Sequence, residues 1–171
     1  MTAEYEQIII TGQLHDDIMR VGKERHELCR QWGQKDKRHV GRNALAWNQQ
    51  GLFAEVAVGI ELDIEWDWMA EWQPGGHDND VNGIQVRSTA GHDRNLLTLE
   101  HDEPGPYVLV TIARVHPQAV ECRIHGWAPL EECNIAAHRT RLPSGDIGYL
   151  TPKTALHRID TLLTTTHRRE S

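Results

Sequence analysis

The sequence predicts an α/β protein in which a central mixed β-sheet is flanked by α-helices. Two segments near the N-terminus carry apolar residues at helical spacing, and several short β-branched runs separated by turn residues follow them. The chain has 171 residues, of which 39% are hydrophobic and 25% charged. This length and balance fit one domain with a core of its own.

The two helices are expected over residues 14–31 and from residue 42 or 43 to Gly59. Charged residues fill the gaps between the apolar positions of the first segment, and Gly33 follows it as a C-cap. In the second segment Glu55 lies among the apolar residues and not on the opposite side. The apolar residues of this segment are Leu45, Leu52, Phe53, Val56, Ala57 and Ile60.

The rest of the chain is expected to be mainly strands. From Ile60 to Trp68 apolar and acidic residues alternate, which predicts a half-buried strand. A short helix is expected at 129–133, irregular structure at 137–152 and a closing helix at 154–163. Further strands are expected at residues 84–89, 95–100, 107–113 and 120–125. No helix is evident between the strands at 84–89 and 107–113.

We expect a single domain over residues 1–171, with three parts. Residues 1–42 would form an N-terminal helix and a basic arm, residues 43–130 the core, and residues 131–171 a C-terminal extension. The distribution of charged residues follows this division, although the net charge of the whole chain is −7. Residues 20–42 carry eight basic and three acidic side chains, whereas residues 55–103 carry twelve acidic side chains and two arginines. Two solvated faces of unlike sign would explain the same pattern.

The cellular compartment is inferred from the cysteines, the N-terminus and the apolar runs. Three widely spaced cysteines contain no Cys-x-x-Cys pair and are expected to be buried or free thiols. The acidic N-terminus lacks the basic start of a secretory signal, and no apolar run is long enough to span a membrane. The sequence therefore predicts a cytoplasmic protein without a membrane partner.

The most informative stretch runs from Asp78 to Thr89. Asp80 precedes a short turn, and the strand after it places Gln85 and Arg87 on one face. Polar side chains on a buried strand need partners, and Asp80 and Glu55 are the candidates. A structural network of ion pairs among these four residues would meet the same requirement.

These residues resemble the motif of PD-(D/E)XK nucleases, the restriction-endonuclease-like superfamily. In that pattern a helix supplies a glutamate, a strand supplies an aspartate and the next strand supplies an acid-x-lysine pair. Glu55, Asp80 and Gln85-Val86-Arg87 match these positions in order. The later run to Gly126-Trp127 is similar to small phage and prophage-type members, and the resemblance covers about residues 44–130.

The resemblance implies a restriction-endonuclease-like core and a metal-dependent DNA nuclease, or a weakly active relative. Glu55, Asp80, Gln85 and Arg87 would be the catalytic residues. Asp80, Glu55 and Gln85 would hold Mg²⁺ or Mn²⁺, with Asp78 as a substitute if Asp80 points away. Arg87 and the basic arm would contact DNA phosphates, and a homodimer would suit cleavage of both strands.

Two residues depart from the hydrolytic pattern. Gln85 supplies a neutral amide oxygen where the pattern has an acid, which weakens the attraction for a cation. Arg87 replaces the lysine, and its guanidinium stays protonated and cannot act as a general base. The alternative is therefore a catalytically silent nuclease-fold protein that binds protein or DNA. A third interpretation, an acidic interaction protein without a site, would place Glu55 and Asp80 far apart.

The histidines and tryptophans carry less information. None of the eleven histidines shows a closed zinc-ligand spacing, and His77, His92 and His101 are expected in solvent-exposed loops. The six tryptophans, three of them clustered at Trp66, Trp68 and Trp72, are expected to pack in the core instead of stacking on bases.

Overall fold

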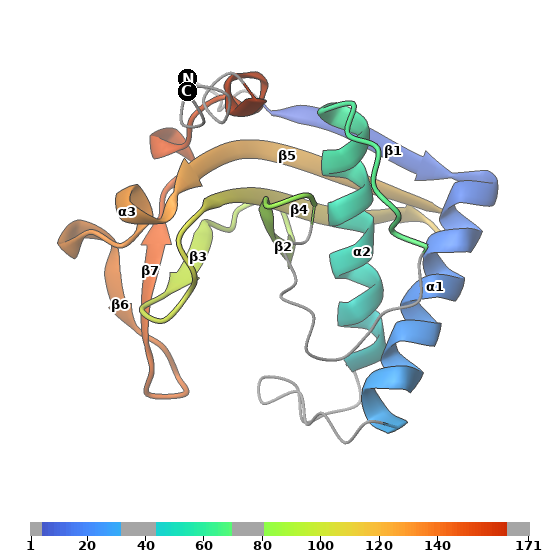
Figure 1. Ribbon diagram of the computed structural model, residues 1–171, viewed down its shortest axis with the longest axis horizontal. Helices are drawn as coiled ribbons and strands as arrows, with labels where there is room; N and C mark the ends of the chain where they lie inside the picture. The colour runs from blue at the N-terminus through green and yellow to red at the C-terminus, as the bar shows by residue number, and fades with distance from the viewer. Residues whose placement is uncertain (1–4, 32–43, 70–80, 164–171) are drawn as a thin grey trace.

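The computed structural model describes residues 5–31, 44–69 and 81–163, and it is a mixed α/β structure (Figure 1). A four-stranded mixed sheet has the order β1-β5-β4-β2, and a three-stranded antiparallel sheet has the order β3-β7-β6. The elements are β1 (Glu6–Thr11), α1 (Gly12–Gln31), α2 (Ala44–Glu61), β2 (Gln85–Ala90), β3 (Leu96–Leu99), β4 (Pro106–His116), β5 (Ala119–Pro129), α3 (Leu130–Cys133), β6 (Arg139–Arg141) and β7 (Ile147–Thr151).

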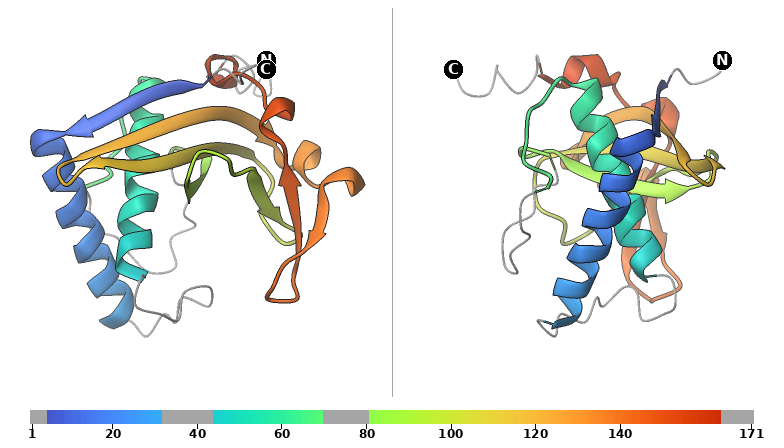
Figure 2. Two further views of the ribbon diagram at one scale, coloured as in Figure 1. Left: turned by 180° about the vertical axis from the view of Figure 1, so that it is seen from behind. Right: turned by 90° about the vertical axis from the view of Figure 1, so that its right-hand side faces the viewer.

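Helices α1 and α2 cover one face of the four-stranded sheet (Figures 1 and 2). The two helices approach closely because Gly22 of α1 has no side chain. A Cβ at that position would lie 2.8 Å from Cγ of Gln49 on α2. The main core lies between the helices and the sheet, and it includes Ile18, Phe53 and Val110. Both predicted helices are confirmed, with α2 extending two residues beyond the expected end.

Strands β4 and β5 form the longest pair in the sheet, and both are buried along most of their length. Val108 and Val110 of β4 face the helices. The alternate residues Tyr107 and Leu109 join a smaller cluster with Leu96 and Cys133. Because strand side chains alternate between faces, β4 separates two apolar clusters.

A β-bulge in β5 changes which side chains reach each face. Leu109 pairs with Gly126, but the next residue, Val110, pairs with Ile124, so that His125 is the additional residue. As a result Trp127 packs in the main core, although His125, two residues earlier, faces away from it. Gly126 has φ +130° and lies against the segment at His157, whose backbone exchanges two hydrogen bonds with Trp127.

The strand predicted from Ile60 to Trp68 is wrong. The first two of these residues end α2, and the chain then turns at Leu62 and Asp63. The amide of Ile64 donates to the carbonyl of Gly59 at 2.9 Å, which folds the segment back on the helix. Ile64, Trp66 and Trp68 still pack against the core. The alternation therefore predicted their burial correctly, but no strand among the described residues pairs with this segment.

The C-terminal part also differs from the prediction. Residues 137–152 contain strands β6 and β7, and the predicted closing helix is replaced up to residue 161 by two short 3₁₀ turns, with only residues 162 and 163 helical. The N-terminal strand β1 was not predicted, although its run Ile8-Ile9-Ile10 before Gly12 is typical of a strand. The strands at 84–89, 95–100, 107–113 and 120–125 and the short helix near residue 130 are confirmed.

Other expectations concern the connection between strands, the cysteines and the membrane. Between β2 and β4 the chain forms β3 and turns, and it has no helix, as predicted. Strands β2 and β4 are parallel. The three cysteines form no disulfide with one another, and Cys122 and Cys133 are buried. In the part of the chain that is described, no helix has the length and apolar character needed to cross a membrane.

Gly126→Ala is expected to lower the free energy of unfolding by about 3 kcal/mol in urea denaturation. The new Cβ would lie 2.3 Å from the carbonyl oxygen of His157, in a backbone conformation that L-residues rarely adopt. Gly145→Ala is the matched control because Gly145 also has positive φ, but a Cβ added there would meet no atom within 4 Å. It should lower the free energy by only about 1 kcal/mol. Equal effects would contradict the close approach at Gly126.

Candidate functional site

Arg87 lies on the face of the four-stranded sheet that is turned away from the helices. Val86, its neighbour on β2, packs in the main core, so Gln85 and Arg87 point to the other face. Arg87 Nη2 lies 2.9 Å from Oδ2 of Asp102, and its guanidinium lies 5.2 Å from the ring centroid of Tyr107. Asp102 also accepts a hydrogen bond from the amide of Leu99 at 2.8 Å. Arg87 is therefore held in a structural ion pair.

Glu55 lies on the helix side of the same sheet. Its side chain is 17% exposed, and Oε2 lies 3.5 Å from Nη1 of Arg25 on α1. Arg25 also donates to the carbonyl of Trp68 at 2.7 Å. Gln50, one turn before Glu55, donates to Oγ of Ser88 at 3.3 Å, which shows that α2 packs on the helix-facing side of β2.

The structure thus separates the described members of the predicted site. The helix that carries Glu55 packs against the strand that carries Gln85 and Arg87, but these two side chains point to the opposite face. Asp80 and its substitute Asp78 lie outside the described residues. Within residues 5–31, 44–69 and 81–163, no group of three or more His, Cys, Asp or Glu side chains is arranged to hold a metal ion. Glu55 and Gln85 by themselves do not fit the proposed cation.

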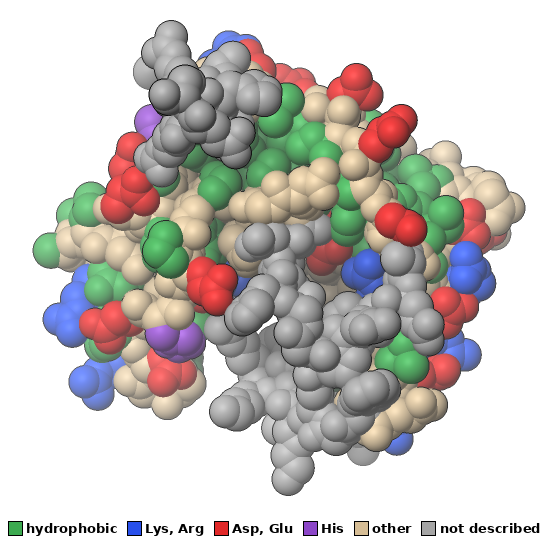
Figure 3. Space-filling model, viewed as in Figure 1, with side chains coloured by type: hydrophobic (Ala, Val, Ile, Leu, Met, Phe, Trp, Pro, Cys, Tyr) green, Lys and Arg blue, Asp and Glu red, His purple; other side chains and the backbone are tan. Residues whose placement is uncertain are grey.

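The basic arm is also less available than its charge suggests. On α1, Arg20 pairs with Asp17 and Glu24, Lys23 pairs with Glu27, and Arg25 pairs with Glu55. Figure 3 shows acidic and basic side chains interspersed along this helix. The remainder of the arm, residues 32–43, lies outside the described part of the chain.

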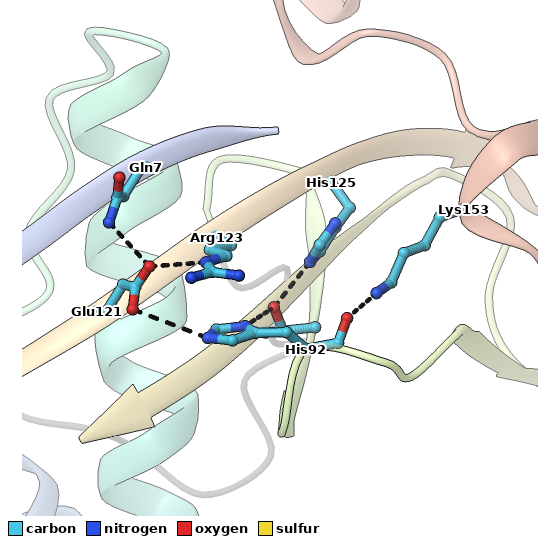
Figure 4. Close-up of polar contacts among 7 residues, drawn as sticks. Gln7, His92, Glu121, Arg123, His125 and Lys153 are labelled. Atoms are coloured by element: carbon cyan, nitrogen blue, oxygen red, sulfur yellow. Dashed lines mark hydrogen bonds and ion pairs between the residues drawn. The ribbon is translucent and has the colours of Figure 1, made fainter. Parts of the chain in front are cut away.

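A second group of polar side chains, absent from the sequence prediction, lies on the sheet face opposite the helices (Figure 4). We call it the sheet-face cluster. The core residues Val120, Cys122 and Ile124 alternate on β5 with its polar members, so these members face away from the helices. The members are Gln7 of β1, His92 after β2, Thr111 of β4, Glu121, Arg123 and His125 of β5, and Lys153 beyond β7.

Thr111 is the centre of the sheet-face cluster, and its side chain is fully buried. Its Oγ1 lies 2.7 Å from Nδ1 of His92 and 2.7 Å from Nε2 of His125. At one end of the cluster, Oε1 of Glu121 accepts hydrogen bonds from Gln7 at 2.8 Å and from Arg123 at 2.6 Å. At the other end, the ammonium of Lys153 donates to the carbonyl of His92.

The single hydroxyl proton of Thr111 gives this chain of hydrogen bonds a direction. The hydroxyl has one proton and two lone pairs, so it can donate to only one imidazole, and at least one imidazole must donate to Oγ1. Oε2 of Glu121 lies 3.8 Å from Nε2 of His92, and a carboxylate favours a proton on that nitrogen. His92 therefore accepts through Nδ1, and His125 donates from Nε2.

Both imidazoles are favoured in their neutral forms. Burial lowers the pKa of His125 to about 4, and the positive charge of Lys153 contributes. Burial and the charge of Arg123 lower the pKa of His92, although Glu121 opposes the shift. Burial also lowers the pKa of Lys153, partly offset by Asp93. At neutral pH the cluster thus combines two neutral imidazoles with two cations.

The sequence contained a signal for this cluster. Glu121, Arg123 and His125 alternate with apolar residues on one strand, which predicts a polar face. The expectation that His92 is a solvent-exposed loop residue is wrong, because its side chain is 25% exposed and bonds to Thr111. His101 is exposed as expected, and His77 lies outside the described residues.

Comparison of this chain with protein-family models, curated proteins and solved structures finds no match.

Asp102→Asn is expected to lower the free energy of unfolding by about 2 kcal/mol, because it leaves the partly buried Arg87 without its charged partner. Asp160→Asn is the control, since the pair between Asp160 and Arg158 is exposed and its loss should change stability by less than about 0.5 kcal/mol. Both values are measured by urea denaturation. A neutral effect of Asp102→Asn would contradict a structural role for the pair.

The low pKa of His125 predicts a loss of stability on acidification. The unfolded chain binds a proton at the ordinary pKa of 6.5, whereas the folded chain binds it only near 4. The stabilisation is therefore complete above pH 6.5 and is lost as the pH falls toward 4. The loss is on the order of 2 kcal/mol once solvent screening is considered.

The measurement is urea denaturation at pH 7.5 and pH 5, comparing the wild type with His125→Gln. The glutamine amide is chosen to donate to Thr111 without titrating. The variant should lose less stability between the two pH values than the wild type. Equal losses would show that His125 does not titrate in this way.

Proposed function

We propose that this chain is a restriction-endonuclease-like protein that binds DNA through phosphate contacts and does not cleave it. The observation that carries the absence of cleavage is the separation of Glu55 from Arg87. Each charge already has a protein partner, Arg25 for Glu55 and Asp102 for Arg87, and the two pairs lie on opposite sides of β2. A carboxylate paired with a guanidinium binds a cation less well, since the arginine already supplies the positive charge.

The fold supports this assignment in a general way. A helix with a half-buried glutamate precedes and packs on the strand that carries Gln85 and Arg87, as the resemblance implies. The neutral Gln85 and the permanently charged Arg87 then replace the groups that hydrolysis requires. We infer that the fold is retained and that Glu55 and Arg87, which occupy positions of the hydrolytic motif, now form structural ion pairs.

The DNA-contacting residues are proposed to lie on β6. Arg139 and Arg141 are both exposed on this short edge strand, and neither forms an ion pair within the described part of the chain. Side chains two apart on a strand share a face, so both guanidinium groups are directed to the same side. Two adjacent arginines fit neighbouring phosphates of a nucleic-acid backbone.

Arg139→Gln combined with Arg141→Gln is expected to weaken duplex DNA binding at least tenfold at 50 mM salt, measured by fluorescence anisotropy. Each lost phosphate contact should also reduce the dependence of log K on log salt by about 1. Arg20→Gln is the control, because Arg20 is already paired with Asp17 and Glu24 and should not contribute. Unchanged DNA affinity in the double variant would exclude β6 as the contact surface.

Metal-dependent hydrolysis is the second candidate, favoured by the packing of α2 against β2. It is tested by incubating supercoiled plasmid with the wild type and with Asp80→Ala in Mn²⁺, and by comparing melting temperatures with and without the metal. We expect no nicking and no change in melting temperature. Nicking by the wild type that is lost in Asp80→Ala would overturn the proposal and establish a nuclease.

A further inference from the structure

The sheet-face cluster has an uneven distribution of charge along its length. Its described carboxylate, Glu121, lies at the end near Gln7 and is already bonded to Gln7 and Arg123 (Figure 4). Lys153 lies at the other end, beyond the two imidazoles (Figure 4). The end of the cluster formed by Lys153 and His125 is therefore rich in nitrogen, and His92 lies between it and the carboxylate, with Nε2 3.8 Å from Oε2 of Glu121.

His125 has unused hydrogen-bonding capacity at this end. It is 8% exposed, and its Nδ1 is buried without a hydrogen bond from any residue in the described ranges. A buried polar atom left in this way is unfavourable for folding. The bulge in β5 is what places His125 here, as the additional residue opposite β4. Bulges that redirect a side chain are frequent at functional sites.

The charges around His125 and His92 also favour an anion. The groups around them are Tyr5 just before β1, Gln7 of β1, Thr111 of β4, Glu121 and Arg123 of β5, Asp93 of the loop and Lys153. Lys153 and Arg123 both oppose protonation of His125, so the local potential there is positive. An anion would offset this repulsion and would stabilise the protonated imidazole.

We propose that the sheet-face cluster binds a phosphate group, held by Lys153, His125 and His92 with Arg123 at the side. An ammonium, a guanidinium and the N–H groups of imidazoles that take up a proton with the anion, from three separate chain segments, suit a tetrahedral ion with several acceptor oxygens better than a planar carboxylate. A phosphate monoester, which carries close to two negative charges at neutral pH, fits the two fixed cations.

This site is independent of the DNA contacts proposed on β6. It uses the face of β4 and β5 opposite the helices, and none of its residues belongs to β6. Binding is coupled to protons in a defined direction. The anion favours imidazolium, so the complex takes up a proton at His125 and raises its pKa.

The test uses inorganic phosphate and histidine-resolved NMR of the full chain. In 20 mM phosphate the pKa of His125 is expected to rise by at least one unit, relative to chloride at equal ionic strength. Lys153→Met and, as a second variant, His92→Gln should each weaken phosphate binding at least tenfold. Lys23→Met, which removes an exposed charge from α1, should leave it unchanged. Circular dichroism and unfolding midpoints identify any variant that fails to fold.

Two further ligands and one protein variant distinguish the sources of the phosphate group. Adenosine monophosphate should bind at least as well as inorganic phosphate, whereas dimethyl phosphate, with one charge, should bind at least tenfold more weakly. The Arg139→Gln and Arg141→Gln double variant should retain phosphate binding even if it loses DNA binding. Equal binding of dimethyl phosphate, an unchanged His125 pKa, or full affinity in both Lys153→Met and His92→Gln would overturn the proposal.

Discussion

The antiparallel pairing of β4 with β5 is the constraint on which the rest of this structure depends. Both strands are buried on two faces, because α1 and α2 cover one side and the β3-β7-β6 sheet covers part of the other. Because successive side chains of a strand point to opposite faces, the buried side chains of β4 and β5 lie in one of two environments. One environment is the large apolar core, and the other contains the smaller apolar cluster and the sheet-face cluster.

The bulge at His125 links this packing to the chemistry of the cluster. It allows Trp127 to enter the main core while His125 stays on the opposite face and bonds to Thr111. The backbone of Gly126 can then approach His157. A single additional residue in one strand thus determines both how the C-terminal segment docks and where a neutral, buried imidazole lies.

The two groups of polar side chains have different physical characters. Arg87 with Asp102, and Glu55 with Arg25, are complete charge pairs that join neighbouring elements. Such pairs fix the arrangement of the elements they join, but their charges are already neutralised. The sheet-face cluster contains a similar pair, Glu121 with Arg123, but it also contains Lys153 and two neutral imidazoles whose protonation depends on their surroundings. The cluster is therefore the part of the described structure that is most responsive to a charged ligand.

Local patterns in the sequence determined the two helices, four strands and the burial of Ile64, Trp66 and Trp68, because periodicity reports which side chains are shielded from water. They did not determine pairing, so the alternating segment at 60–68 was predicted as a strand although nothing pairs with it. Likewise, the order of Glu55, Gln85 and Arg87 along the chain predicted a shared site. Only the tertiary structure decided that β2 presents Arg87 away from α2, and that His92, Thr111 and His125 meet. Those contacts join segments distant in sequence, and their geometry depends on strand register and one bulge, which no local pattern encodes.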